Sequence, residues 1–198
     1  MYDCSHQRVP VIGHLFVGKT SITNRIISNS FFDTVSTTGV QDQIKSYIRN
    51  GQEIKVQFWD TAGQERFRSL IPSFLRGAQC VLIVYSIIDE DSFNSIDEFR
   101  QLVEELVENP NSKIILCANK EDLRLSYTKP ISKDRGQELA NKYGWRFVSV
   151  SAKTGLGIED LENDILQIIM DGQTNQIVTN TIQDIDSEKK KESSQDCC

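Results

Sequence analysis

The 198-residue sequence lacks an excess of basic residues, a spaced set of cysteines, and any apolar run long enough to cross a membrane. Its 22 Lys and Arg against 28 Asp and Glu give a net charge of −6, which argues against nucleic-acid binding because that function needs a basic face. Cys80 and Cys117 lie in apolar runs and indicate buried thiols in a reducing compartment. The N-terminus shows neither a signal-peptide apolar region nor a Met-Gly start, so we expect a cytosolic chain.

Strand-like and helix-like segments alternate along the chain. The near-continuous apolar runs at 80–87 and 113–119 are typical of parallel strands that are covered on both faces. The alternation predicts an open α/β sheet whose ligands bind at the carboxyl ends of its strands. The other expected elements are strands at 8–12, 44–49, 54–59 and 146–150, and helices at 19–28, 133–143 and 158–170.

Three local features refine this picture. Asn50-Gly51 joins two alternating runs and is the strongest short hairpin signal. A further helix is expected from an N-cap at Ser92 or Asp91. Pro10 disagrees with a place in a central strand, because proline cannot donate a hydrogen bond to the ladder.

The segment GHLFVGKT at 13–20 matches the P-loop pattern G-x-x-x-x-G-K-T and lies between an expected strand and an expected helix. Backbone N–H groups at a helix N-terminus attract anions, Lys19 can reach the β- and γ-phosphates, and the Thr20 hydroxyl can bind Mg²⁺. An ordinary glycine turn before a helix has the same spacing. The pattern alone does not choose between ATP and GTP.

Later motifs make that choice. Asp60 in WDTAGQERF follows a strand, where its carboxylate can hold Mg²⁺ through water, and the N–H of Gly63 can meet the γ-phosphate. In NKED, Asp122 can accept hydrogen bonds from N1–H and the 2-amino group of guanine, which adenine lacks there, while Lys120 can lie along the base. Ser151-Ala152-Lys153 can brace the same pocket. Four motifs in this order, each at the carboxyl end of a strand, predict a guanine-nucleotide site.

With these motifs, residues 8 to about 170 closely resemble the Rab family of Ras-superfamily small GTPases. WDTAGQERF is the most specific stretch, and FLRGA at 74–78 and the terminal Cys-Cys favour Rab over the Ras, Rho and Arf branches. The resemblance implies an α/β P-loop fold with a six-stranded, mostly parallel sheet, one antiparallel strand and about five helices. It also implies a GTP/GDP switch in vesicle and membrane trafficking, on the cytoplasmic face of an endomembrane and with a cytosolic pool.

The resemblance further implies partners and residue roles. The partners are a guanine-nucleotide exchange factor, a GTPase-activating protein, a GDP-dissociation inhibitor or escort protein, and effectors; we expect a monomer. Gln64 orients the attacking water, and Phe31 packs against the base edge. A switch-loop threonine adds a second Mg²⁺ ligand: counting back from Asp60 selects Thr37, whereas counting forward from Lys19 reaches Thr38, and we favour Thr37. The expected nucleotide contacts are Gly13, Phe16, Val17, Gly18, Lys19, Thr20, Ser21, Phe31, Thr37, Gly63, Asn119, Lys120, Asp122, Ser151, Ala152 and Lys153, and the expected metal ligands are Thr20, Thr37 and Asp60.

Leu15 and Phe16 depart from the family pattern, which has small residues over the γ-phosphate. A left-handed Phe16 in a phosphate nest costs roughly 1–2 kcal/mol, which weakens binding without abolishing it. Leu15 can displace Gln64, the attacking water, or an arginine finger worth about 10³–10⁵ in rate. We therefore expect GTP to be bound but hydrolysed slowly; the alternatives are a small loop shift with normal turnover, and a GTP-loaded scaffold with little or no hydrolysis. His14 is expected to be a solvated loop residue rather than a catalytic base.

The expected effector face departs as well. The family's hydrophobic triad corresponds here to Asp42, Trp59 and Phe74, and the first position is usually phenylalanine. An aspartate removes an apolar anchor, so familiar effectors should not be assumed. Gln41, where the family usually has Asp or Glu, points the same way.

The chain divides into a G domain at 1–171 and a tail at 172–198 that is polar, without periodicity and expected to be flexible and hypervariable. The three lysines at 189–191 are outnumbered by five carboxylates within the tail, so electrostatics are a weak membrane anchor. Cys197 and Cys198 resemble the Rab signal for two geranylgeranyl groups, and two lipid chains give stable anchoring where one is marginal. The alternative is an exposed, redox-sensitive pair.

Overall fold

The computed structural model describes residues 6–32, 40–61, 71–108 and 113–172. The strands are β1 Gln7–Gly13, β2 Val40–Arg49, β3 Gln52–Thr61, β4 Val81–Ser86, β5 Ile114–Asn119 and β6 Arg146–Ser149. They form one sheet in the order β2-β3-β1-β4-β5-β6, in which β2 is antiparallel to β3 and the other pairs are parallel. The predicted six-stranded, mostly parallel sheet with one antiparallel strand is therefore confirmed.

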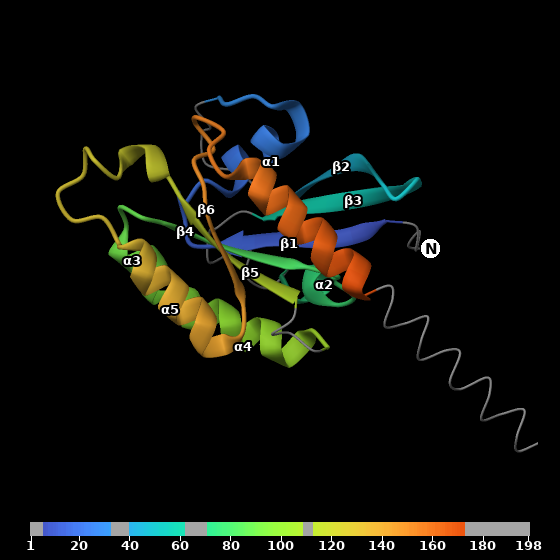
Figure 1. Ribbon diagram of the computed structural model, residues 1–198. Coiled ribbons are helices and arrows are strands. Elements are labelled where there is room, and N and C mark those ends of the chain that lie inside the picture. The colour runs from blue at the N-terminus through green and yellow to red at the C-terminus, as the bar shows by residue number, and fades with distance from the viewer. Residues whose placement is uncertain (1–5, 33–39, 62–70, 109–112, 173–198) are drawn as a thin grey trace, which may run out of the picture.

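Helices cover both faces of this sheet (Figure 1). They are α1 Lys19–Ser28, α2 Ile71–Leu75, α3 Glu90–Asn94, α4 Ile96–Leu106, α5 Lys133–Tyr143 and a helix over 158–172, with a 3₁₀ turn η3 at Glu121–Leu123. Among these described elements, no helix is both long enough and apolar enough to span a bilayer.

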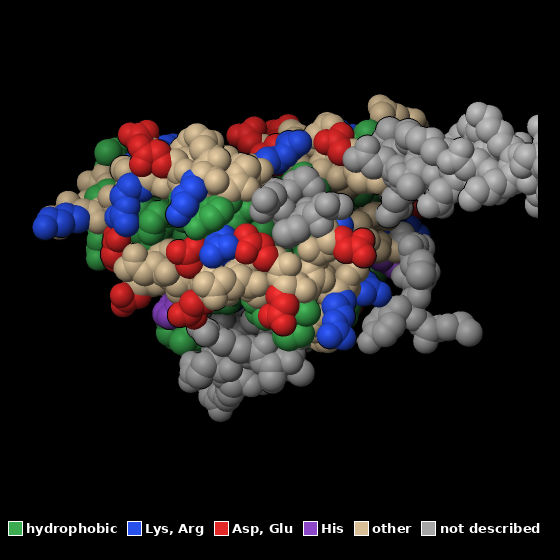
Figure 2. Space-filling view, turned by 90° about the horizontal axis from the view of Figure 1, so that it is seen from below, with side chains coloured by type: hydrophobic (Ala, Val, Ile, Leu, Met, Phe, Trp, Pro, Cys, Tyr) green, Lys and Arg blue, Asp and Glu red, His purple; other side chains and the backbone are tan. Residues whose placement is uncertain are grey.

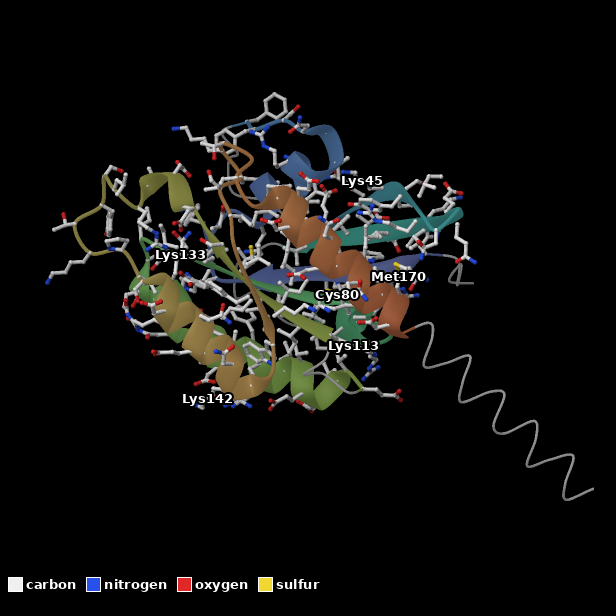
Figure 3. All side chains as sticks on the ribbon, in the orientation of Figure 1. Lys45, Cys80, Lys113, Lys133, Lys142 and Met170 are labelled. Carbon is white, nitrogen blue, oxygen red and sulfur yellow. The ribbon has the colours of Figure 1, made fainter. Side chains whose placement is uncertain are left out.

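The core has two halves because neighbouring residues of a strand point to opposite faces. In β4, Leu82 and Val84 pack in the cluster under α1 and the helix 158–172, whereas Ile83 and Tyr85 pack in the cluster under α2, α4 and α5. Cys80, labelled in Figure 3, and Cys117 are fully buried in the first cluster. Both thiols are therefore buried, as predicted, and this burial raises the pKa of each.

The hairpin between β2 and β3 forms as predicted. Asn50 has φ 51° and Gly51 has φ 77°, so both turn residues are left-handed. A two-residue turn with two positive φ angles has the twist that paired strands need. The strands themselves are longer than the alternating runs in the sequence.

Pro10 does lie in a central strand, paired in register with Trp59 of β3. Arg8, two residues earlier, directs its backbone toward the β4 side: its N–H donates to Gln79 Oε1 (2.5 Å) and its carbonyl accepts from the backbone N–H of Gln79 (3.1 Å). Alternate residues of a parallel strand face the same neighbour, so Pro10 also faces β4, where the ladder begins only at Val11. The missing N–H falls just before the ladder, which resolves the conflict seen in the sequence.

The helix expected from Ser92 or Asp91 is wrong in its start and in its continuity. Asp89 is the N-cap of α3, and its side chain accepts from the backbone N–H of Ser92 (3.2 Å). The Ser92 hydroxyl instead accepts from the backbone N–H of Ser86 at the end of β4 (3.0 Å). The helix breaks at Ser95, and α4 begins at Ile96. The helix starts earlier than predicted because the Ser92 hydroxyl bonds to the end of β4 and Asp89 provides the N-cap.

On the face shown in Figure 2, Lys and Arg side chains are interspersed with Asp and Glu side chains. Ion pairs on the described helices include Arg100–Glu104, Arg100–Asp97 and Arg135–Glu90. Such mixed surface charge agrees with the net charge of −6.

Candidate functional site

The loop between β1 and α1 has the backbone of a phosphate cradle. Gly13 (φ 145°) and Gly18 (φ 96°) both have positive φ. A Cβ at Gly13 would collide with the carbonyl oxygen of Val84, and one at Gly18 would collide with Nδ2 of Asn119. Glycine is therefore required at both positions for two reasons: the backbone has a positive φ, and there is no room for a Cβ atom. Gly18 caps α1, and its carbonyl accepts from the backbone N–H of Ile22 (2.9 Å).

Lys19 is buried and reaches back across this loop. Its Nζ donates to the carbonyls of Gly13 (3.0 Å) and His14 (2.7 Å). Burial lowers the pKa of Lys19 to about 8, although the charge of Asp60 opposes the shift. An ammonium group has three N–H donors, so one remains for a phosphate oxygen, whose negative charge would also favour the protonated amine.

Thr20 and Asp60 form the candidate metal centre. The Thr20 hydroxyl donates to Asp60 Oδ2 (2.5 Å), while Oδ1 is buried and has no hydrogen-bond partner among the described residues. Burial raises the pKa of Asp60, against the hydrogen bond from Thr20 and the charge of Lys19. Mg²⁺ usually takes one or two carboxylates, waters and substrate phosphates. An unpartnered carboxylate oxygen beside a hydroxyl fits that ion.

Asn119, at the end of β5, joins two loops of the site. Its Nδ2 donates to the carbonyl of Val17 in the phosphate loop (2.8 Å). Its Oδ1 accepts from the backbone N–H of Ala152 (3.1 Å). The side chain is buried, so these bonds satisfy polar groups that would otherwise be lost inside the protein. Asn119 thereby fixes the distance between the loop for phosphate and the loops for the base.

Asp122 and Lys120 lie on the two sides of Glu121 in the loop that follows β5. The Ser151 hydroxyl donates to Asp122 Oδ1 (2.6 Å) and accepts from the backbone N–H of Thr154 (3.1 Å). Lys120 has φ 70°, a left-handed conformation that is uncommon outside glycine. Burial lowers the pKa of Lys120, while Asp89 and Asp122 oppose that shift.

Arg25 is a site residue that sequence reasoning missed. Its Nε donates to the carbonyl of Ala152 (2.8 Å), and its guanidinium also donates to the carbonyls of Lys153 (2.6 Å) and Asn29 (2.7 Å). Arg25 thus fastens the end of α1 to the Ser151–Lys153 loop. The available signal was a basic residue in the last turn of a helix, where cations are favoured.

Phe16 has φ 56° and is 72% exposed, so the left-handed backbone anticipated for it is present. Leu15 beside it is half-buried. The expectation for His14 is wrong in part: the residue is half-buried, and its Nδ1 is buried without a partner within the described ranges. Its carbonyl accepts from the buried Lys19, which holds this part of the loop inward.

Two of the expected effector residues, Asp42 and Trp59, lie on one face of the β2–β3 hairpin, and the third, Phe74, lies in α2. Asp42 is directly opposite Trp59 in the antiparallel register, and the Trp59 ring packs on Phe74 with centroids 4.8 Å apart. Asp42 Oδ2 accepts from Gln57 Nε2 (2.8 Å). A carboxylate therefore lies beside the aromatic pair, as the sequence predicted.

The carboxyl ends of β1, β3, β5 and β6 bring most of the predicted site to one edge of the sheet. The residues found there are Gly13, Phe16, Val17, Gly18, Lys19, Thr20, Ser21, Asp60, Asn119, Lys120, Asp122, Ser151, Ala152 and Lys153. Phe31 is half-buried and packs against the core cluster under α1. The predictions for Thr37, Thr38, Gly63, Gln64, Cys197 and Cys198, and for the side chain of Gln41, fall outside the described residues.

Comparisons with known proteins agree with this geometry. The family model described as the Ras family matches residues 8–171. Ras-related protein RAB1BV of Beta vulgaris is 37% identical over 171 residues, which cover 84% of this chain and 79% of the relative. Ras-related protein Rab-3 of Caenorhabditis elegans is 35% identical over 162 residues (81% and 73%), and Ras-related protein Rab-3C of Bos taurus is 34% identical over 170 residues (85% and 74%).

Proposed function

This chain is a Rab-type member of the Ras family of small GTPases, and from that premise we propose that it is a slow GTP/GDP switch in vesicle and membrane trafficking. The observation that carries the nucleotide assignment is that the buried side chain of Asn119 bonds to both Val17 and Ala152. Because one buried amide holds the phosphate loop to the base loops, a single ligand with both a phosphate and a base fits the site.

Each end of the proposed nucleotide has its own residues. Lys19 and the backbone of the phosphate loop hold the phosphates. Thr20 and Asp60 would hold Mg²⁺, which would neutralise part of the charge of the phosphates. Asp122, oriented by the Ser151 hydroxyl, selects guanine. Thr37 would be the second protein ligand of the metal, as the family resemblance implies.

The nucleotide and the metal can be tested together. Competition of GDP, GTP, ADP and ATP for the purified chain, with Mg²⁺ or with EDTA, should show a guanine preference and Mg²⁺-dependent retention. Equal competition by adenine nucleotides would support a P-loop ATPase or kinase instead.

Hydrolysis is proposed to be slow because of the two bulky residues of the phosphate loop. Gln64 orients the attacking water, and Leu15 crowds the space that this water, Gln64 and an arginine finger need. The finger contributes about 10³–10⁵ in rate, so a blocked approach would matter more than any intrinsic loss. Phe16 points largely into solvent and acts on the backbone of the loop rather than on the reacting atoms.

Single-turnover GTP hydrolysis tests this part, with and without a GTPase-activating protein that acts on a related Rab. Leu15→Ser should restore most of the rate, and Phe16→Gly should change it little, so each single variant is the control for the other. Equal rates for the wild type and Leu15→Ser/Phe16→Gly, with the activating protein present, would sink the slow-switch proposal.

A GTP-loaded membrane scaffold is the second candidate, and the same two residues favour it. It differs from a slow switch in phosphate release alone. A chain that holds GTP through many hours of incubation without releasing phosphate, even with an activating protein, would be the scaffold.

Membrane attachment is proposed to depend on geranylgeranylation of Cys197 and Cys198. The protein would cycle, as a monomer, between the cytoplasmic face of an endomembrane and a cytosolic pool held by a GDP-dissociation inhibitor or escort protein, under an exchange factor and an activating protein. Asp42 beside Trp59 and Phe74 favours effectors other than those that need an apolar residue at this point. Replacing both cysteines by serine should leave the protein cytosolic, and membrane retention of that variant would contradict the proposal.

A further inference from the structure

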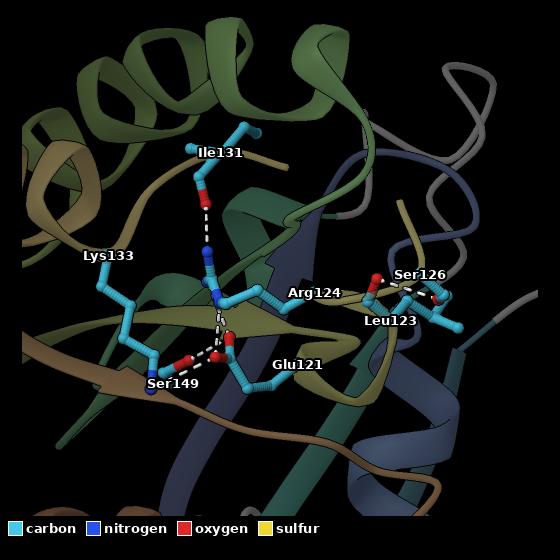
Figure 4. Close-up of polar contacts among 7 residues, drawn as sticks. All are labelled: Glu121, Leu123, Arg124, Ser126, Ile131, Lys133 and Ser149. Carbon is cyan, nitrogen blue, oxygen red and sulfur yellow. Dashed lines mark hydrogen bonds and ion pairs between the residues drawn. The ribbon is translucent and has the colours of Figure 1, made fainter. Parts of the chain in front are cut away.

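Glu121 occupies the position between Lys120 and Asp122 to which the guanine motif assigns no contact. Its side chain is nevertheless only 7% exposed, and side chains from three segments converge on its carboxylate (Figure 4). Arg124 donates to both oxygens, from Nε to Oε1 (2.5 Å) and from Nη2 to Oε2 (2.7 Å). The Ser149 hydroxyl donates to Oε2 (2.8 Å), and Lys133 Nζ lies 3.2 Å from Oε1.

These contacts fasten the base loop to the rest of the domain. Ser149 ends β6, and Lys133 begins α5. Arg124 also donates from Nη1 to the carbonyl of Ile131, so the segment before α5 is held as well. The backbone N–H of Glu121 donates to the carbonyl of Val150 (3.1 Å), which ties the same residue to the end of β6 a second time.

The carboxylate stays charged in this environment. Burial by itself raises the pKa of Glu121, but the hydrogen bonds from Arg124, Ser149 and Lys133 outweigh burial and lower the pKa to about 2. Charge-assisted hydrogen bonds are shorter and stronger than neutral ones. Glu121 therefore acts as a fixed anion with defined partners across the physiological pH range.

We propose that Glu121 is a positioning residue for guanine recognition: its clamped carboxylate holds the loop so that Lys120 and Asp122, on either side of it, face the base. The inference rests on the proposed function of this pocket. Lys120 has a left-handed backbone conformation, and Asp122 Oδ1 accepts a hydrogen bond from Ser151. Both arrangements require that the backbone of the loop keeps its position. Among the described residues, the contacts of the Glu121 carboxylate (the Glu121 clamp) hold the loop at the position between Lys120 and Asp122.

The test compares GDP with inosine diphosphate (IDP), which lacks the 2-amino group that Asp122 would bind. Glu121→Gln keeps the size of the side chain but removes the charge and turns an amide donor toward Arg124, Ser149 and Lys133. One hydrogen bond to a charged group is worth on the order of tenfold or more in an equilibrium constant. GDP dissociation should therefore accelerate about tenfold, and IDP dissociation should change less. The factor by which the protein prefers GDP to IDP should then fall at least about threefold.

Two further variants keep the test decisive if Glu121→Gln folds poorly. Ser149→Ala removes one of the donors and should narrow the ratio in the same direction by a smaller factor. Glu138→Gln on the exposed side of α5 is the matched control and should leave both nucleotides unchanged. Thermal unfolding of each variant reports any general loss of stability.

The outcomes separate the inference from the proposed function. If GDP and IDP lose affinity by the same factor in Glu121→Gln and Ser149→Ala, or lose none, Glu121 serves stability alone and the inference is overturned. If the wild-type chain shows no preference for GDP over ADP, the proposed function fails first and the inference fails with it.

Discussion

Replacing Phe16 by glycine and by alanine separates backbone strain from side-chain bulk in the phosphate loop. Phe16 has φ 56°, and the residue is 72% exposed, so removing the ring loses little packing. Alanine keeps the Cβ that makes a left-handed backbone unfavourable, whereas glycine has no such atom. The difference between the two variants therefore measures the backbone strain less the extra freedom that glycine gives the unfolded chain.

The magnitude follows from two opposing free energies. A left-handed non-glycine residue costs roughly 1–2 kcal/mol. Glycine adds freedom to the unfolded chain, which costs about 0.4–1 kcal/mol of stability relative to alanine. The midpoints of these ranges, about 1.5 and about 0.7 kcal/mol, leave the free energy of unfolding of Phe16→Gly about 0.8 kcal/mol above that of Phe16→Ala.

Urea unfolding at fixed, saturating GDP and Mg²⁺ is the assay. With an m-value of about 2 kcal/mol per molar urea, the midpoint of Phe16→Gly should lie about 0.25–0.5 M above that of Phe16→Ala. Phe32, 64% exposed and without a positive φ, is the matched control, where the order should reverse. A Phe16→Gly variant that is less stable than Phe16→Ala would refute the strain argument.

Three further predictions concern the buried groups of the site. Burial lowers the pKa of Lys19 to about 8, whereas the pKa in the unfolded chain is near 10.5, so the nucleotide-free protein should become more stable as pH rises between these values. In the same pH range, GDP binding should be accompanied by the uptake of a proton. Calorimetry in buffers of different ionisation enthalpy should show this proton uptake for the wild type and none for Lys19→Met. Asp60→Asn keeps an acceptor for Thr20 but loses the charge, so EDTA should no longer speed GDP release; a full EDTA effect in this variant would place the metal elsewhere. Asn119→Ala leaves the Val17 carbonyl and the Ala152 N–H buried without a hydrogen-bond partner, which should cost about 1–3 kcal/mol of unfolding free energy for each group. If urea unfolding shows a loss below about 1 kcal/mol, Asn119 does not connect the two loops as described.

Local patterns in the sequence were sufficient for much of the fold. The helices expected at 19–28 and 133–143 match α1 and α5, because apolar spacing and capping residues act within a few positions. Asn50-Gly51 specified the hairpin for the same reason, since the turn needs only two residues with positive φ. The helix near Ser92 was mispredicted, because its hydroxyl bonds across to Ser86 and leaves the cap to Asp89.

The sequence by itself determined which chemical groups the site contains: a lysine and a hydroxyl after a glycine loop, one carboxylate for metal and one for the base. Only the tertiary structure decided which of those groups contact one another and which other residues hold them in place. Thr20 meets Asp60 across 40 positions of sequence, and Arg25 meets Ala152 across 127. A motif records residue types and spacing along the chain, whereas such contacts arise when sheet order brings distant strand ends to one edge. The contacts of Glu121 also arise from the tertiary structure, so the NKED motif contains Glu121 without specifying its partners.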